Sequence, residues 1–141
     1  MSVGRRHRAE LRMRGTLEEV WAVLANPSLW PQVNPQIRKV SDRTHSVVFE
    51  GEEFLSESQS DVGDEVHQSR WVVREVVPQQ RVVYHAFDQR NPAHYTDIGF
   101  VLTPEKGRTV VQGWSKTTRK WHDCILRIFF LTEGKLLKDT F

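Results

Sequence analysis

Two histidines, His85 and His94, are the side chains of this sequence best placed for acid–base chemistry, because they fall on neighbouring predicted strands. Histidine titrates near neutral pH, so a histidine in a mostly apolar pocket with hydroxyl neighbours could abstract and return a proton. A structural role is the alternative, in which the two rings hydrogen-bond strand side chains or the polar group of a ligand. The sequence leaves both roles open, and His94 and His85 are the candidate catalytic residues.

No other set of reactive side chains has a recognisable spacing. The six histidines, at positions 7, 45, 67, 85, 94 and 122, do not show the paired spacing of a zinc site. The single cysteine, Cys124, follows His122 by two residues, which on a helix directs the two side chains about 200° apart. The sequence also lacks a phosphate-binding glycine loop. We therefore expect no metal and no cofactor.

The composition is that of an ordinary globular chain with almost balanced charge. The 141 residues include 20 basic and 18 acidic side chains, a net charge of +2, and 38% are hydrophobic. That length and apolar fraction suffice for one folded domain spanning residues 1–141. A net charge this small does not indicate nucleic-acid binding. Arginines crowd residues 5–14 and acidic residues crowd residues 50–65, which we interpret as solvated strand faces, with a protein-interaction domain as an alternative.

The sequence contains no signal of secretion or of membrane insertion. One cysteine excludes an internal disulfide, and the N-terminus has no secretory hydrophobic region. The longest apolar run, "CILRIFFL", includes an arginine and is far shorter than the ~20 residues of a membrane span. We expect a cytoplasmic protein without stable membrane insertion, as a monomer or a homodimer.

The first forty residues predict a strand followed by a bent pair of short helices. Residues 5–14 alternate between polar and apolar side chains, as a half-buried strand does. Thr16 and Glu19 have the spacing of a capping box, and an apolar stripe follows at helical spacing. Pro27 both ends this helix and can open a second one in "NPSLW", which two further prolines keep short.

The remaining residues predict consecutive strands and then, from Trp121, a terminal helix. Turn sequences such as "VGD", "PQQ", "QRNP" and "PEKG" separate the strands, and these loops are too short for crossovers, so the strands must pair antiparallel. We predict an α+β fold, a curved antiparallel sheet of about seven strands around a C-terminal helix, with the two short helices at the rim of a cavity. The strand-like ranges are 36–42, 45–59, 65–77, 80–88, 93–103 and 108–118.

Three segments carry a resemblance to a known superfamily: "TLEEVWAVLANPSLWPQVNPQIRKV", "VVREVVPQQRVVY" and "GFVLTPEKGRTVVQGWS". With the order of elements, they resemble the SRPBCC, or START-related, superfamily, and within it the polyketide cyclase/dehydrase-like group, over nearly the whole chain. The resemblance implies a helix-grip fold with a deep hydrophobic cavity. Members of the superfamily include lipid carriers, aromatic polyketide cyclases, hormone receptors and chaperone cofactors. Their final helix usually continues further, so a chain ending at Phe141 is expected to have a short or truncated one.

The turn positions predict which residues face the cavity. If "QRNP" is a loop, Asp88 pairs with Ala93; if "PEKG" is the next loop, Thr103 pairs with Arg108. One face of these strands is then apolar at one end and polar at the other, which suits a ligand pocket or, alternatively, strands whose ends are simply wet. A one-residue slip would turn the whole set outward. The inward residues in this register are Val83, His85, Phe87, His94, Thr96, Ile98, Phe100, Leu102, Val111, Ser115 and Thr117.

Three further residues complete the predicted ligand site. Trp71 joins the inward face if "PQQ" is a three-residue loop, Trp30 lies at the cavity rim or in the core, and Phe129 lies in the last helix. The predicted function is that of a binding protein for a small hydrophobic molecule such as a lipid or an aromatic polyketide. A polyketide cyclase or dehydratase with a cavity histidine is the alternative. The predicted ligand-binding residues are Trp30, Trp71, His85, Phe87, His94, Thr96, Phe100, Ser115 and Phe129.

Overall fold

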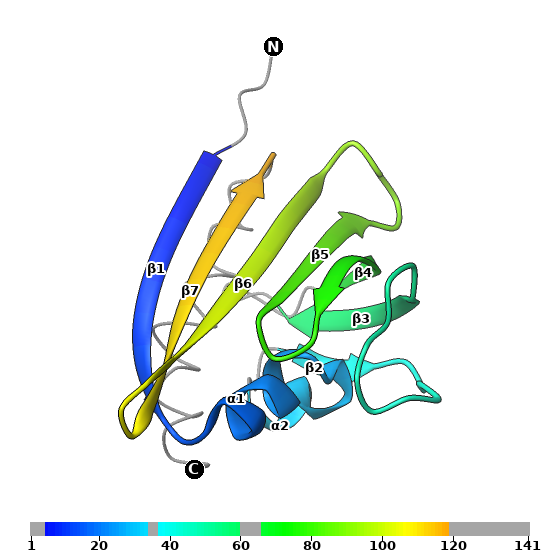
Figure 1. The fold of residues 1–141 in the computed structure, drawn as a ribbon. Helices are drawn as coiled ribbons and strands as arrows, with labels where there is room; N and C mark the ends of the chain where they lie inside the picture. The colour runs from blue at the N-terminus through cyan, green and yellow to red at the C-terminus, as the bar shows by residue number, and fades with distance from the viewer. Residues whose placement is uncertain (1–4, 34–36, 60–65, 119–141) are drawn as a thin grey trace.

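The computed structural model describes residues 5–33, 37–59 and 66–118, which form one antiparallel sheet with short helices at one end (Figure 1). The strand order is β1-β7-β6-β5-β4-β3-β2, and the predicted curved sheet with two short helices after the first strand is confirmed. We call the face on which the helices pack the inner face. The predicted terminal helix lies outside the described residues. The elements are β1 Arg5–Arg14, α1 Leu17–Leu24, η1 Pro27–Leu29, α2 Trp30–Val33, β2 Ile37–Val40, β3 Glu53–Gln59, β4 Val66–Val77, β5 Arg81–Asp88, β6 Tyr95–Glu105 and β7 Arg108–Thr117.

The helices begin where the capping chemistry of the sequence predicts. The Thr16 hydroxyl accepts a hydrogen bond from the Glu19 amide at 3.2 Å, and the Glu19 carboxylate accepts one from the Thr16 amide at 3.1 Å. This capping box starts α1. The Asn26 side chain then accepts a bond from the Ser28 amide at 3.3 Å, and Pro27 opens η1, which leads directly into α2. The helices therefore turn the chain around one end of the sheet.

Four aromatic side chains form the centre of the core between the helices and the sheet. Trp30, Phe54, Trp71 and Tyr84 are at most 4% exposed. The Trp30 ring meets the other three edge-on, with centroid separations of 5.8, 5.1 and 5.2 Å in that order. Edge-to-face pairs of this kind each stabilise a fold by about 0.5–1.5 kcal/mol beyond the burial of their area. The cluster thus fixes α2 against β3, β4 and β5.

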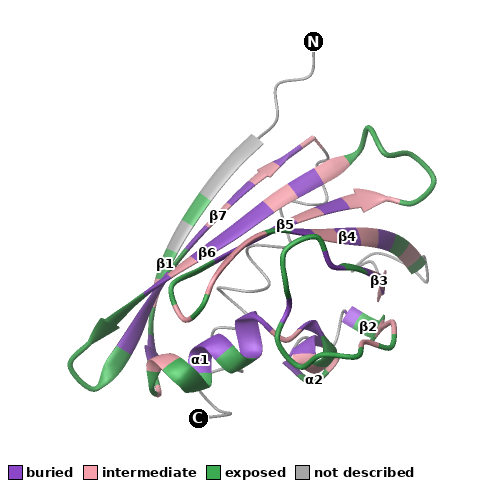
Figure 2. Ribbon diagram, turned by 45° about the vertical axis from the view of Figure 1, so that its right-hand side comes forward, coloured by how far each residue is buried: buried purple, intermediate pink, exposed green. Residues whose placement is uncertain are grey.

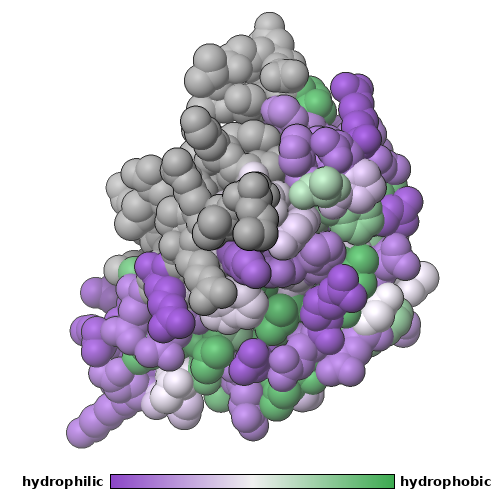
Figure 3. Space-filling view, turned by 90° about the horizontal axis from the view of Figure 1, so that it is seen from above, coloured by the Kyte–Doolittle hydropathy of each residue, from purple (hydrophilic) through white to green (hydrophobic). Residues whose placement is uncertain are grey.

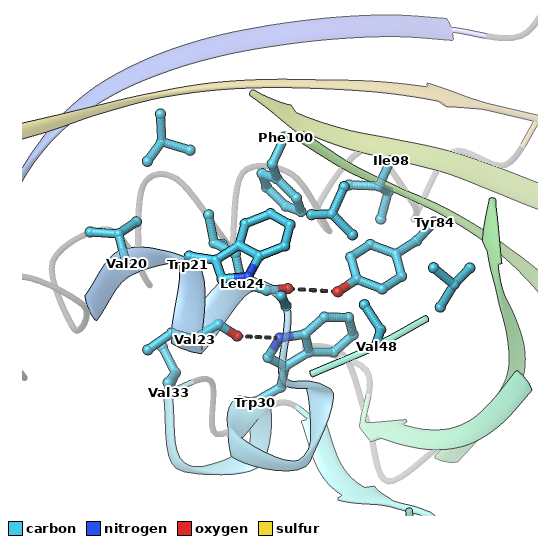
Figure 4. Packing of buried hydrophobic residues seen from close by; sticks show 14 of the residues in the cluster. Val20, Trp21, Val23, Leu24, Trp30, Val33, Val48, Tyr84, Ile98 and Phe100 are labelled. Atoms are coloured by element: carbon cyan, nitrogen blue, oxygen red, sulfur yellow. Dashed lines mark hydrogen bonds between the residues drawn. The ribbon is translucent and has the colours of Figure 1, made fainter. Parts of the chain in front are cut away.

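Two buried hydrogen bonds tie this aromatic cluster to the last turn of α1 (Figure 4). The Trp30 indole donates to the Val23 carbonyl at 3.1 Å, and the Tyr84 hydroxyl donates to the Leu24 carbonyl at 2.6 Å. Burial raises the pKa of the Tyr84 phenol well above its ordinary value of 10.0, which keeps it a neutral donor. The open carbonyls at the end of α1 are therefore bonded by side chains of other elements.

The pairing of β5 with β6 differs by one residue from the predicted register. Asp88 pairs with His94 rather than with Ala93, and its amide donates to the His94 carbonyl at 3.0 Å. The loop is one residue longer because two successive turns are bonded at Asn91, whose amide donates to Asp88 and whose carbonyl accepts from His94. Successive strand side chains alternate in direction, so this difference turns β5 over. The prediction for β5 was therefore wrong: Val82, Tyr84 and Ala86 face inward, and Val83, His85 and Phe87 face outward.

The β6–β7 hairpin differs from the predicted register by two residues, which leaves its faces unchanged. Glu105 rather than Thr103 pairs with Arg108, so the hairpin closes through a two-residue turn in which Gly107 has a φ of 72°. Thr96 consequently lies opposite Thr117 instead of Ser115. The predicted inward residues of these strands are buried, and buried and partly exposed positions alternate along much of β6 (Figure 2).

The predicted strand over residues 45–59 is shorter than expected, because residues 41–52 form a loop. A buried ion pair holds this loop: Arg43 Nε lies 2.6 Å from Glu52 Oε2, and the two side chains are 2% and 9% exposed. Arg43 also donates to the Asn26 side chain at 3.0 Å. Gly51, with a φ of 86°, turns the chain into β3. The loop is thereby fixed to the junction of α1 and η1.

Candidate functional site

Three hydroxyl side chains are buried on the inner face where β6 begins and β7 ends, at the end of the sheet away from α1 and α2 (Figure 1). They are Thr96, Ser115 and Thr117, with exposures of 0%, 1% and 1%. Thr96 lies opposite Thr117, and Ser115 lies opposite Ile98. We call these three residues the hydroxyl cluster.

Hydrogen bonds within the cluster involve the two threonines but not the serine. Thr96 Oγ1 lies 2.9 Å from Thr117 Oγ1, which lies 3.4 Å from the Tyr95 carbonyl oxygen. The Ser115 hydroxyl has no hydrogen-bond partner among the residues that the structure describes. A buried hydroxyl without a partner costs about 1–3 kcal/mol, so it is unusual in a folded protein.

In contrast to Ser115, the polar side-chain atoms of the aromatic core have hydrogen-bond partners within the protein. Trp30 and Tyr84 donate to carbonyls of α1, and the Trp71 indole donates to the Ser56 hydroxyl at 2.8 Å. These groups are bonded within the protein, which is the normal state of a packed core. Among the residues that the structure describes, the Ser115 hydroxyl is the buried side-chain group left without a hydrogen-bond partner.

Apolar side chains continue the inner face from the hydroxyl cluster toward α1. Ile98, Phe100, Leu102 and Val111 are at most 4% exposed, and the first two extend the face directly beside Ser115 (Figure 4 shows both over the helices). The face is therefore apolar near the helices and hydrogen-bonding near the start of β6. This gradient was predicted for β6 and β7, and it is confirmed there.

Charged groups are scarce in the buried part of the described chain. Arg43 and Glu52 are buried together, and they satisfy each other. They belong to the loop before β3, whereas the hydroxyl cluster lies on β6 and β7, with β4 and β5 between them. In the described ranges, no group of His, Cys, Asp and Glu side chains is arranged to bind a metal ion.

His85 lies on the outer face and not beside Thr96 as the predicted register requires. Its Nδ1 is 2.6 Å from Asp97 Oδ1, and its ring lies between those of Phe87 and Tyr95, with centroid separations of 5.7 and 5.2 Å. Ala86 takes the position opposite Thr96. The two candidate catalytic histidines are therefore not brought together, and Phe87 is likewise outside the inner wall.

His94 and the two tryptophans of the predicted site lie at opposite extremes of exposure. His94 is exposed and precedes β6, two residues from Thr96, with its amide bonded to the Asn91 carbonyl at 2.9 Å. Trp30 and Trp71 are buried in the aromatic cluster. "PQQ" does form a three-residue loop between Val77 and Arg81, but Trp71 faces inward because a register shift between Val73 and Glu75 pairs it with Ala86 and not with Phe87. Phe129 lies outside the described residues.

Sequence analysis missed Tyr84 and the Arg43–Glu52 pair. A one-residue change of register is what brings Tyr84 inward, and the sequence "QRNP" does not state the length of its loop. Arg43 and Glu52 are nine positions apart in a loop, most of which the alternation of polar and apolar residues predicted to be a strand. A polar–apolar pattern does not distinguish a buried charge that is paired from an exposed one.

Two shallow hollows lie on the surface of the described residues. One, of about 210 Å³, is lined by Lys39, Ser41 and residues of β3 and β4, and the other, of about 300 Å³, lies beside Phe49 and Arg43. Hydrophilic and hydrophobic residues are interspersed on the face seen in Figure 3. Within the described part, no helix is long and apolar enough to cross a membrane.

Solved structures with very different sequences share this fold. The di-domain ARO/CYC StfQ from the steffimycin biosynthetic pathway is similar with a TM-score of 0.76 and 15% identity, over 98% of this chain and 50% of that one. The Zhui aromatase/cyclase from Streptomyces sp. R1128 has a TM-score of 0.72 and 12% identity, over 97% and 93% of the two chains. Ara h 8.0201 has a TM-score of 0.74 and 9% identity, over 97% of both. Identities this low show the fold alone, which is the helix-grip fold.

The fold and the sequence together place the chain in the SRPBCC superfamily, so the resemblance found in the sequence is confirmed. A family model described as Activator of Hsp90 ATPase homolog 1-like protein matches residues 14–122, and the chain belongs to this family. None of the curated proteins matches the sequence.

Proposed function

We propose that this chain is a binding module for a small, mostly apolar molecule, held on the inner face of the sheet with its polar group at the hydroxyl cluster. The observation that carries the proposal is the Ser115 hydroxyl, which is 1% exposed and has no partner in the described part of the chain. A ligand group bonded to Ser115 would remove a cost of about 1–3 kcal/mol. The protein would thus be stabilised by the molecule that it binds.

The neighbourhood of Ser115 supports an apolar body for this ligand. Binding sites for small molecules are mostly apolar, with a few polar groups that orient the ligand. Ile98 and Phe100 supply the apolar wall on β6, and Thr96 and Ser115 supply the polar groups. An aromatic or polycyclic molecule fits such a wall, and an aromatic polyketide or a lipid remains the proposed class.

Two of the similar structures are named as aromatase/cyclases, which supports the aromatic polyketide as the class. Fold likeness alone does not transfer an activity. A cyclase or dehydratase would need an acid–base residue at the ligand, and His94, exposed in the turn two residues before Thr96, is the remaining candidate. Binding is the function that the hydroxyl cluster itself supports.

Native mass spectrometry of the purified protein, with Nile red titration followed by fluorescence, would test the proposal. We expect a co-purified small molecule or saturable binding of the neutral probe. Ser115→Ala should weaken binding by about 2- to 10-fold, the loss of one hydrogen bond, without lowering the stability of the free protein. Ser46→Ala, at an exposed serine, is the matched control and should change neither. Absence of both a bound molecule and saturable probe binding would contradict the proposed function.

A further inference from the structure

We propose that the loop between β2 and β3, with the first residue of β3, forms a docking surface for a basic surface of another protein. Its members are Val47 and Phe49, which are apolar, and Asp42, Glu50 and Glu53, which are acidic, and all five are exposed. We call these residues the Phe49 surface. It is separated from the hydroxyl cluster by β4 and β5, so the proposal does not depend on the ligand of the inner face.

Two large apolar side chains of this surface are directed into solvent. Phe49 is 50% exposed and Val47 is 42% exposed, whereas Val48 between them is 3% exposed. The Val48 amide donates to the Ala25 carbonyl at 2.9 Å, which fixes the middle of the loop against the end of α1. A single exposed apolar side chain is ordinary, but two from one short segment form an apolar spot that a partner can cover.

The loop holds the Phe49 ring in place before any partner arrives. The Phe49 amide donates to the Glu52 carboxylate at 3.3 Å, and the Gly51 amide donates to the Val73 carbonyl at 2.8 Å. The ring itself meets the His45 ring edge-on, with a centroid separation of 5.4 Å. Binding to a segment that is already ordered costs little conformational entropy, and aromatic side chains held in this way supply much of the binding energy of protein interfaces.

Acidic groups surround this apolar spot. The hollow of about 300 Å³ beside Phe49 has Asp42 and Glu53 in its lining. Arg43 also lines it, but this side chain is 2% exposed and is paired with Glu52, so the charges that face solvent are carboxylates. An arginine or lysine of a partner can enter the hollow, where its cation lies close both to the face of an aromatic ring and to carboxylates.

The acidic groups decide between the possible partners. An anionic membrane, a nucleic acid or an acidic protein is repelled by them, whereas a basic protein surface is attracted. Glu53 also lies 3.3 Å from Arg70, but both side chains are exposed, and exposed ion pairs contribute little to stability. The partner that fits is therefore a protein segment with apolar side chains for Val47 and Phe49 and with lysines or arginines beside them.

A short helical peptide of leucine and lysine, with the leucines on one face, is a probe with this chemistry. Fluorescence anisotropy of the labelled peptide, titrated with the whole chain, measures its affinity. We expect saturable binding that weakens as salt is added, because the charges at the edge of the surface are screened. A peptide of the same pattern with glutamate in place of lysine should not bind.

Two variants assign the binding to the Phe49 surface. Phe49→Ser should weaken it by about tenfold, because the aromatic anchor is lost. Asp42→Asn combined with Glu50→Gln should weaken it by about threefold at low salt and reduce its salt dependence. Val66→Ser, at an apolar residue of β4 that is 40% exposed, is the matched control and should change the affinity by less than about twofold. Thermal unfolding verifies that each variant is folded.

Several results would overturn the proposal. They are an unchanged affinity in Phe49→Ser, equal binding of the glutamate peptide, and no binding of the lysine peptide at about 0.1 mM. Binding to phosphatidylglycerol vesicles that Phe49→Ser abolishes would make the surface a membrane contact instead. Sedimentation velocity that shows a dimer in the wild type and a monomer in Phe49→Ser would assign it to a second copy of the chain. None of these results affects the ligand proposed for the inner face.

Discussion

Gly99 of β6 and Trp114 of β7 face each other across their ladder on the outer side of the sheet, and the Trp114 indole occupies the space that a side chain at Gly99 would need. A Cβ placed at residue 99 would overlap the indole ring. The glycine is therefore required for close packing of a half-buried ring on the backbone, and not for an unusual backbone conformation. This pair covers the outer surface of the strands whose inner surface carries the hydroxyl cluster.

Replacement of Gly99 by alanine should lower the free energy of unfolding by about 1–3 kcal/mol, because the indole must move to admit a methyl group. Urea unfolding of Gly99→Ala measures the loss. A double-mutant cycle with Trp114→Ala is the control, since the smaller residue at 114 leaves room for the methyl group. If Gly99→Ala costs as much in the Trp114→Ala background as in the wild type, the proposed overlap is not the cause.

Removal of one partner of the buried Arg43–Glu52 pair should destabilise the protein strongly. Arg43→Met leaves the Glu52 carboxylate buried without its counter-charge, and Glu52→Gln does the reverse, so each should cost about 3–5 kcal/mol. The double variant Arg43→Met with Glu52→Gln should cost less than the sum, because no uncompensated charge remains. Chemical unfolding of the three variants provides the comparison. Additive losses would mean that the two groups do not depend on each other.

Tyr84 should make the stability of the protein fall at high pH. Its phenol has a pKa near 10.0 when unfolded and a higher one when folded, because burial disfavours the charged form. Its contribution is therefore full below pH 10.0 and is lost as the pH rises toward the folded value, since the unfolded state releases its proton first. The advantage of wild type over Tyr84→Phe in urea unfolding should shrink between about pH 9 and pH 11. A difference that stays constant with pH would show that the phenol is not buried in the folded state.

His85→Ala should leave the affinity for Nile red unchanged within about twofold, because the ring lies on the outer face against Asp97. Loss of this partly exposed contact with Asp97 should cost no more than about 1 kcal/mol of stability. The two measurements are fluorescence titration and urea unfolding, with Ser115→Ala as the variant that does affect binding. A loss of affinity equal to that of Ser115→Ala would mean that β5 presents its other face inward.

The order of elements and the capping chemistry of the first helix could be predicted from the sequence because both depend on local signals. Thr16 and Glu19 are three residues apart, and the proline positions exclude long helices. Alternation also identified the inner residues of β6 and β7. The family motifs predicted the same fold as the capping box, the prolines and the strand alternation.

The orientation of β5 could not be predicted, because it depends on whether its loop has four or five residues. An error of one residue between Asp88 and His94 turned His85 and Phe87 outward, whereas an error of two residues in the next hairpin left Thr96 and Ser115 in place. Strand faces repeat every two residues, so odd errors invert a face and even errors preserve it. The prediction of which side chains face inward was thus wrong for β5 and correct for β6 and β7.

The pairing of β1 with β7 joins the earliest and latest described strands of the chain. Leu11 can pair with Val111 only after Val111 has been synthesised. At ordinary rates of synthesis of about 5–20 residues per second, this takes about 5–20 s. Contacts this distant in sequence also slow spontaneous folding. The first strand therefore remains an unpaired edge until β7 has been synthesised, and its charged outer side, with Arg8, Glu10 and Arg12, disfavours pairing with other nascent chains during that interval.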